Sequence, residues 1–424
     1  MRAHFFLSLF LYTRGNSPIY GGLSDFGYYF VDVLVGSPPQ RMSAILDTGS
    51  EGLLVACSTC TSCGAGHMDP FFNPSVSESF SRLPECPASN LRNPECTFEK
   101  RYLEGSLLKG KVFNDVVSVS ESAVAKRTNF GCIEKETKLF LEQKANGIFG
   151  LSPLSKTDWL FGGSPSVNSF SVCLAREGGD ILFHAGDTST RPDTSIPLSY
   201  LEGHYVVSPS SISVGQDWMV SAGNISSYVG AEVLVDSGST ITYFTDKLYR
   251  VIFERIQKSI SHLKLQEDTS GPAVCLIVEG KEEVQTLLPI ISISFQGFRE
   301  GQVISATFYN YTYSVSGKEC LTIASNAGLD RTDLGASWMI GKNITFSSSS
   351  GWMQIDPSAG CTNRSISQRR PVEPVEGQLN REPEYSVAAM FGLVSIMLSI
   401  GLVLFFITRR SIAETRYQPV IEEE

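Results

Sequence analysis

Short apolar runs broken by turn-forming residues make up most of the hydrophobic pattern of this chain. Residues 28–36 (YYFVDVLVG) form such a run, which stops at Ser37-Pro38-Pro39-Gln40 and predicts a strand followed by a turn. Residues 246–263 differ, because apolar residues recur there at helical spacing. These are Leu248, Val251, Ile252, Ile256 and Ile260. The pattern predicts a protein dominated by β-strands, with an amphipathic helix at 246–263.

Two of the apolar runs end in the same polar turn. Residues 44–50 read AILDTGS, and residues 233–239 read VLVDSGS. Each run is of strand type, reaches an Asp (Asp47 or Asp236), and then breaks into Gly and hydroxyl residues. Gly lets the backbone bend where a side chain would clash, and hydroxyls can hold the turn rigid through hydrogen bonds. The repeat indicates that two carboxylates are presented in the same way.

Composition narrows the class of protein. With 424 residues, 42% of them hydrophobic, the chain can form large buried cores, and two lobes fit its length. A formal net charge of −10 argues against nucleic acid and anionic membrane surfaces as partners. Ten cysteines and four Asn-x-Ser/Thr sequons together favour the oxidising secretory route. The sequons, which are candidate glycosylation sites, begin at Asn224, Asn310, Asn343 and Asn363.

The repeated Asp turn resembles that of the pepsin-like aspartic proteases, and the resemblance extends over residues 18–361. It implies a bilobal fold in which the lobes supply the catalytic Asp47 and Asp236, one each. The residues implied to support them are Thr48, Gly49, Ser50, Ser237, Gly238 and Ser239. Two carboxylates this close cannot both ionise cheaply. The resemblance therefore implies that they share one proton, as in other members of this family. One Asp then acts as a base toward water and the other as an acid, with no metal or cofactor.

Residues 98–106 (FEKRYLEGS) resemble the flap, the family's hairpin that closes over substrate. Tyr102 matches the flap tyrosine, and Glu104 and Gly105 form the tip. The resemblance implies that these residues bind substrate and exclude water from the carboxylates; an ordinary polar-tipped hairpin is the alternative. Most members have a Trp at the position of Leu54, so the hydrogen bond of that Trp to the tyrosine must be lost or replaced.

Five of the ten cysteines lie in a cysteine-rich insert at 57–96. Its Cys-x-x-Cys spacing could suit zinc, but a secretory chain favours disulfides. The insert resembles that of nepenthesin-like enzymes and of the plasmepsin V group. The resemblance implies the pairs Cys57–Cys132, Cys173–Cys361 and Cys275–Cys320. It leaves open the partners among Cys60, Cys63, Cys86 and Cys96.

Two further segments resemble parts of the family. Residues 147–151 (GIFGL) match the apolar-apolar-Gly segment that supports the first catalytic loop, and 338–341 (WMIG) are expected to be its counterpart in the second lobe. Both are interpreted as buried strands that end in Gly. The flap sequence and residues 140–151 (FLEQKANGIFGL) narrow the resemblance to the plasmepsin V group.

The ends of the chain carry targeting patterns. Residues 1–14 predict a signal peptide, with a truncated or misassigned start as the alternative. Residues 366–386 are polar and typical of a stalk. Residues 387–407 hold no charge over 21 positions and precede Arg409-Arg410, which predicts a membrane helix and a cytosolic tail at 408–424, with a core helix as the alternative.

This layout predicts a type I membrane protein of the endoplasmic reticulum, Golgi or endosomes. Its luminal part consists of an N-terminal lobe at 15–175 and a C-terminal lobe at 176–365, and we expect a monomer. Tail residues 417–420 (YQPV) have the Tyr-x-x-apolar form read by vesicle-sorting adaptors, although so short a match is frequent by chance.

The function expected from the sequence is that of a membrane-anchored aspartic endopeptidase acting on polypeptides. The plasmepsin V group implies cleavage at Arg-x-Leu motifs in secreted or exported proteins. A general sheddase and a non-catalytic binding protein on the same scaffold are the alternatives. The chain has no His-Glu-x-x-His and no Gly-x-Ser-x-Gly motif, which disfavours metalloproteases and serine hydrolases.

Overall fold

The computed structural model describes residues 16–83, 86, 96–119, 125–153, 167–185, 191–262, 265–268, 274–278, 284–308, 311–315, 317–326, 328–357 and 360–369. All of them belong to one compact unit. Among them, no helix combines the length and apolar character that a membrane crossing needs. The predicted signal peptide, membrane helix and cytosolic tail, and all but the first residues of the stalk, lie outside the described residues.

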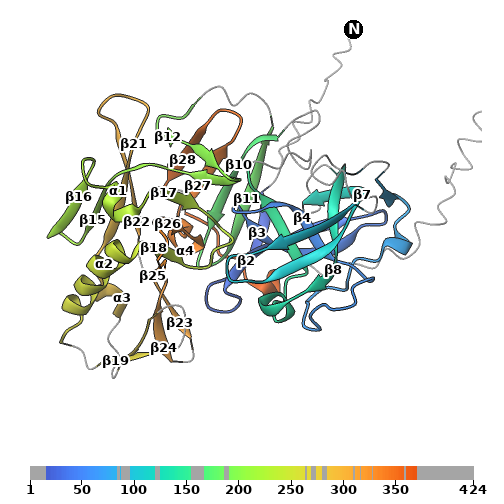
Figure 1. The fold of residues 1–424 in the computed structure, drawn as a ribbon, viewed down its shortest axis with the longest axis horizontal. Helices are drawn as coiled ribbons and strands as arrows, with labels where there is room; N and C mark the ends of the chain where they lie inside the picture. The colour runs from blue at the N-terminus through green and yellow to red at the C-terminus, as the bar shows by residue number, and fades with distance from the viewer. Residues whose placement is uncertain are drawn as a thin grey trace, which may run out of the picture. The chain divides into compact units, whose positions relative to one another are not determined.

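Most strands of the first half join one large sheet that also takes in β12, β27 and β28 (Figure 1). Its strands, in spatial order except for the last, which pairs with β7, are β12 (Ser195–Pro197), β28 (Trp352–Asp356), β27 (Asn343–Ser347), β10 (Val167–Leu174), β11 (Glu177–Ala185), β1 (Ser17–Gly22), β2 (Tyr28–Val35), β3 (Gln40–Asp47), β9 (Gly147–Leu151), β4 (Glu51–Ala56), β8 (Lys126–Glu136), β7 (Leu107–Val119), β5 (Ser81–Arg82) and β6 (Thr97–Arg101). The sheet therefore connects the two halves of the chain.

The second half adds three smaller sheets. The first contains β13 (Ser199–Leu201), β14 (His204–Val206), β17 (Glu232–Val235), β26 (Arg331–Leu334), β18 (Thr242–Phe244) and β25 (Ile323–Ser325). The second contains β16 (Trp218–Ser221), β15 (Pro209–Val214), β21 (Ile291–Gln296) and β22 (Val303–Phe308). The third contains β19 (Leu265–Asp268), β20 (Cys275–Val278), β24 (Lys318–Leu321) and β23 (Thr312–Val315). The described part of the chain is thus mainly β and bilobal, as predicted.

Helices are few and short in the described part of the chain. They are α1 (Ser226–Val229), α2 (Asp246–Ser259), α3 (Val284–Leu287), α4 (Ala336–Met339) and the 3₁₀ turns η1 (Pro74–Val76), η3 (Lys138–Leu141) and η4 (Ile366–Gln368). The longest, α2, confirms the helix predicted from periodicity. Thr245 caps its first turn by accepting a hydrogen bond from the Leu248 amide, and Leu248, Ile252 and Ile256 form its buried face.

Both Asp-bearing strands lie beside a parallel strand. β3 pairs with β9 so that Asp47 lies opposite Gly150. β17 pairs with β26 in the same sense, with Val235 opposite Leu334. The assignment of 338–341 as the second supporting strand is therefore wrong: its first two residues belong to α4, and β26 is the strand.

The acidic Asp333 explains this error. It stands two residues before Gly335, where the first half has the apolar Ile148 before Gly150, so the expected apolar-apolar-Gly pattern is broken. Asp333 is only 5% exposed, and Arg331 of the same strand pairs with it at 3.0 Å. Because Arg331 compensates the charge, β26 can occupy a position that normally takes apolar residues.

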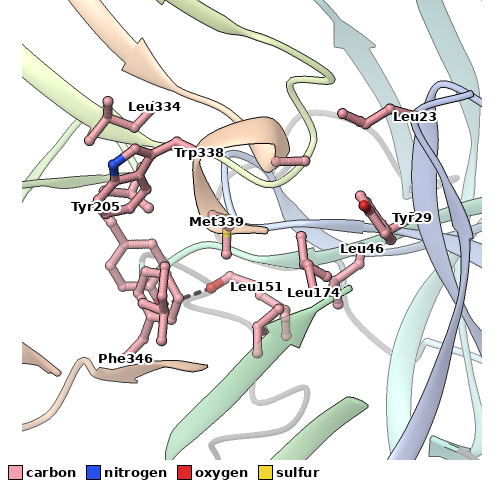
Figure 2. Packing of buried hydrophobic residues seen from close by; sticks show 14 of the residues in the cluster. Leu23, Tyr29, Leu46, Leu151, Leu174, Tyr205, Leu334, Trp338, Met339 and Phe346 are labelled. Carbon is pink, nitrogen blue, oxygen red and sulfur yellow. Dashed lines mark hydrogen bonds between the residues drawn. The ribbon is translucent and has the colours of Figure 1, made fainter. Parts of the chain in front are cut away.

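One buried apolar cluster runs through both halves. Figure 2 shows Trp338 and Met339 of the second half near Leu151 and Leu174 of the first. The Tyr205 hydroxyl donates to the carbonyl oxygen of Leu151 at 2.8 Å within this cluster (Figure 2). The shared core holds the ends of β3 and β17 in a defined relation.

Candidate active site

Asp47 is the last residue of β3 and is 6% exposed. The amide of Gly49 donates to its Oδ1 at 2.8 Å, and the Ser50 hydroxyl donates to its Oδ2 at 2.5 Å. These bonds fix the plane of the carboxyl group.

Asp236 follows β17 and has the same two kinds of partner. The amide of Gly238 donates to Oδ1 at 2.9 Å, and the Ser239 hydroxyl donates to Oδ2 at 2.8 Å. The two repeats in the sequence therefore fold into equivalent turns.

The turns face each other across a short gap. The Asp47 and Asp236 carboxyl groups lie within hydrogen-bonding range of each other. A Cβ at Gly49 would lie 2.5 Å from Oδ1 of Asp236, and one at Gly238 would collide with the Asp47 carboxyl. Glycine is required at both positions because only its bare backbone lets the two carboxylates approach.

Thr48 and Ser237 lock the turns together. The Thr48 amide donates to Oγ of Ser237 at 3.0 Å, and the Ser237 amide donates to Oγ1 of Thr48 at 2.9 Å. Each hydroxyl also donates to a carbonyl oxygen of the other half, that of Val235 or Leu46. The predicted loop-support residues thus all contact the carboxyl groups or each other.

The environment of the Asp47 carboxyl group raises its pKa. Burial and, second, the negative charge of Asp236 raise the pKa of Asp47 to about 7. The hydrogen bonds from Ser50 and Gly49 lower that pKa, but by less. The pair therefore retains a proton, held by Asp47, in acidic and near-neutral water.

The predicted flap is the hairpin of β6 and β7. At its turn the Gly105 amide donates to the carbonyl oxygen of Tyr102 at 2.9 Å, and Gly105 has φ 86°, a conformation that favours glycine. The Tyr102 ring packs edge-on against Phe140 at 5.0 Å between centroids. Burial and the charge of Asp47 raise the pKa of Tyr102 well above its usual range. The flap tyrosine therefore lies close to Asp47.

The hydroxyl of Tyr102 is buried. Leu54, which stands where most members have a Trp, is an apolar member of the cluster against which Tyr102 packs, so it cannot supply the hydrogen bond of that Trp. Ser50 of the first Asp turn is the polar side chain that acts on the hydroxyl, because it lowers the pKa of Tyr102.

Glu104 is exposed at the flap tip. Nζ of Lys138, at the start of η3, donates to the Glu104 carbonyl oxygen at 3.4 Å and would clash with any side chain at Gly105. The Glu104 carboxylate also acts on Tyr243 of the second half. Its charge raises the pKa of Tyr243, after the larger effects of burial and of the Asp333 charge. Sequence reasoning missed Lys138, which carries no motif, and used Phe140 only as part of the segment 140–151; both reach the flap only through the fold.

All ten cysteines form disulfides. Cys57–Cys132, Cys173–Cys361 and Cys275–Cys320 are the pairs that the resemblance implied. The pairs that were left open are Cys60–Cys63 and Cys86–Cys96. The sulfurs of the insert are therefore all engaged in disulfides, and the described residues contain no cluster that could hold a metal ion.

Two family descriptions match the chain. One, described as xylanase inhibitor N-terminal, matches residues 29–184, and the other, described as xylanase inhibitor C-terminal, matches residues 204–355. Together they cover well over half of the chain, and each contains one Asp turn.

Relatives with assigned names agree on the family. The chain is 35% identical to plasmepsin V of Plasmodium falciparum over 182 residues (39% of this chain and 30% of that protein). It is 37% identical to aspartic protease 5 of Toxoplasma gondii over 195 residues (38% and 20%). It is 28% identical to aspartic proteinase nepenthesin-2 of Nepenthes gracilis over 335 residues (74% and 73%). The chain belongs to the pepsin-like aspartic protease family.

Membership in this family accounts for the paired turns and for the hairpin beside them. The chain matches less than a third of the length of its plasmepsin V and aspartic protease 5 relatives. It matches nearly three quarters of nepenthesin-2.

Proposed function

We propose that this protein is an aspartic endopeptidase in which Asp47 and Asp236 are the catalytic residues. The observation that carries the proposal is the juxtaposition of two equivalently hydrogen-bonded carboxyl groups that share a proton. A flap tyrosine next to Asp47 supports it.

The mechanism follows from the difference between the carboxyl groups. Asp236 accepts a proton from a water molecule that attacks the peptide carbonyl carbon. Asp47 donates its proton to the carbonyl oxygen as the tetrahedral intermediate forms. As the C–N bond breaks, Asp236 returns its proton to the leaving amine, and Asp47 takes back a proton from one hydroxyl of the intermediate, which becomes the carboxylic acid product. Each carboxyl group acts once as acid and once as base, so both are required.

The test is peptide cleavage by Asp47→Ala and Asp236→Ala. Both variants should stay folded, because each Asp lies at a strand end, and both should lose turnover. Retained turnover in either variant would falsify the assignment. Inhibition of the unaltered protein by a statine-type mimic of the tetrahedral intermediate should accompany these losses.

A non-catalytic binding role is the second candidate, and the xylanase inhibitor descriptions favour it. Such proteins need no proton-sharing pair. Both Asp residues, their Gly and hydroxyl partners, and Tyr102 are present here, which favours the enzyme. Tight binding to a polysaccharide hydrolase by a chain that cleaves no peptide would reverse this choice.

For the substrate, we propose proteins with Arg-x-Leu motifs. Glu104 supports this because it is an exposed carboxylate at the flap tip whose charge reaches Tyr243 in the other half. A carboxylate in that place can pair with both arms of an arginine guanidinium. A general sheddase without this preference is the alternative.

We further propose a monomeric type I membrane protein of the secretory pathway, with the lobes at 15–175 and 176–365 in the lumen. Five disulfides are consistent with an oxidising compartment. Asn224 and Asn363 are exposed, Asn343 is half-buried in β27, and Asn310 lies outside the described residues. A tag after Glu424 should be reachable only from the cytosol; a luminal tag would exclude this topology. If Tyr417→Ala leaves the compartment unchanged, adaptors do not read residues 417–420.

A further inference from the structure

A cavity of about 240 Å³ lies between residues of both halves, and neither catalytic Asp lines it. Its wall includes Arg176, which follows β10, and Lys342, which follows α4. Several hydroxyl side chains and the apolar Leu23, Ile340 and Pro357 complete the wall, whereas no Asp or Glu is among the described residues that line it. The polar part of the wall therefore consists of cations and hydroxyl groups.

Lys342 has an uncompensated buried charge. The residue is 4% exposed, and its Nζ donates to the carbonyl oxygen of Trp338 at 2.6 Å and, weakly, to that of Ile340 at 3.5 Å. Within the described ranges no carboxylate pairs with it, and burial lowers its pKa to about 7. A buried ammonium is costly without an anion beside it, so an anion in the cavity would stabilise the charged form.

Two hydroxyls of the same wall lack partners. Thr312 and Thr322 are 4% and 1% exposed, and neither Oγ1 has a hydrogen-bond partner in the described part of the chain. Buried hydroxyls are normally hydrogen-bonded, so unpaired ones need an explanation. Arg176 is exposed and donates to Gln285 at 2.9 Å through one Nη, which leaves further guanidinium donors.

We propose that this cavity binds a small oxyanion, either a carboxylate or a phosphate, held by Lys342 and Arg176 and by the hydroxyls of Thr312 and Thr322. The volume limits the ligand to a small molecule or ion. The site is separate from the proposed peptidase centre, although α4 links them: the Ala336 amide donates to the Ser239 carbonyl oxygen at 2.8 Å. A bound anion would join the two halves behind the second Asp turn.

The test is thermal unfolding of the full chain in mildly acidic buffer, titrated with phosphate or with succinate at an ionic strength held constant by sodium chloride. A ligand that binds the folded state raises the unfolding temperature in a saturable way. We expect this with at least one anion, and the more effective anion identifies the ligand class. Lys342→Met should abolish the rise. Thr322→Val and Arg176→Gln should weaken the apparent affinity by about tenfold each, as expected for a hydrogen bond to a charged group.

Lys258→Met is the matched control, because it removes one positive charge from a side chain that is 81% exposed and should respond like the unaltered protein. An equal rise in Lys342→Met, or no saturable rise with either anion, would show that Lys342 only caps the carbonyl groups of α4. If Lys342→Met does not fold, the other two variants decide: unchanged affinity in both overturns the site.

Discussion

Thr48 and Ser237 exchange hydrogen bonds from backbone to side chain in both directions, 189 positions apart in the chain. Both side chains are buried. These two hydrogen bonds hold the Asp turns in register. Asp47 and Asp236 therefore face each other, although neither takes part in the contact between Thr48 and Ser237.

We predict that Thr48→Val and Ser237→Ala each lower the free energy of unfolding by about 1–3 kcal/mol, because each leaves buried backbone groups unpaired. Urea unfolding of the full chain measures this. The double variant should lose less than the sum, since the two hydroxyls serve the same contact. Ser227→Ala is the control and should change stability little, because the exposed Ser227 hydroxyl donates to the nearby Asn224 carbonyl and accepts from the exposed Lys247. Additive losses would mean that the two residues act independently.

The raised pKa of Asp47 predicts how activity depends on pH. Peptide hydrolysis should proceed in acidic buffer and fall as the pH rises through about 7, where Asp47 loses its proton and the acid is lost. Initial rates with one peptide across pH measure this. A rate that still climbs above neutral pH would contradict the proton-sharing pair.

The free energy of unfolding should also depend on pH through the protonation of Asp47. The folded pKa of Asp47 lies above its unfolded value, so the folded state binds more protons between about pH 4 and about pH 7. The free energy of unfolding should therefore fall as the pH rises across that window. Asp47→Asn should lack this part of the decline. An identical decline in the variant would assign it to other groups.

Glu104→Gln tests substrate choice. If Glu104 pairs with a substrate arginine, the variant should lose more than tenfold in kcat/KM on an Arg-x-Leu peptide, about 1.5–3 kcal/mol for a charge-assisted hydrogen bond. A matched peptide with Ala for Arg should be nearly unaffected, and a Lys peptide should be cleaved less well, because Lys lacks the planar fork.

Glu99→Gln is the control for this prediction. Glu99 lies on the same hairpin, but its carboxylate is already paired with Arg101 at 2.6 Å and Lys109 at 2.5 Å, so it should not discriminate between the peptides. Equal losses of Glu104→Gln on the Arg and Ala peptides would show that Glu104 shapes the flap and does not read the arginine.

Arg369 is a long-range contact at the end of the described chain. Its side chain is 8% exposed and lies 2.6 Å from both Asp32 and Asp69. Arg369→Met should lower the free energy of unfolding by about 3–5 kcal/mol, because it leaves the buried Asp69 carboxylate and the partly buried Asp32 carboxylate with less compensation. Arg299→Met, which breaks an exposed pair with Asp193, should cost at most about 1 kcal/mol. Similar losses in the two variants would show that the Arg369 contact adds nothing beyond a surface pair.

Local features were predictable from the sequence because their causes lie within a few residues. The Asp turns, β2, the flap hairpin and α2 are each specified by periodicity, glycine or capping in one segment. The strand beside β17 was not, because Asp333 interrupts its apolar pattern and Arg331 compensates it only in the folded chain. The partners of Cys60 and Cys86 were equally undetermined, since spacing does not fix connectivity.

By itself, the sequence determined which residues could do chemistry: two carboxylates in equivalent turns, and a tyrosine on a hairpin. Only the tertiary structure decided that Asp47 is the carboxyl group with the raised pKa, that Arg369 pairs with Asp32, and that Lys342 is buried beside two unpaired hydroxyls. The reason is physical. A pKa or an uncompensated charge depends on burial and on the charges nearby, and those neighbours come from segments far apart in the chain.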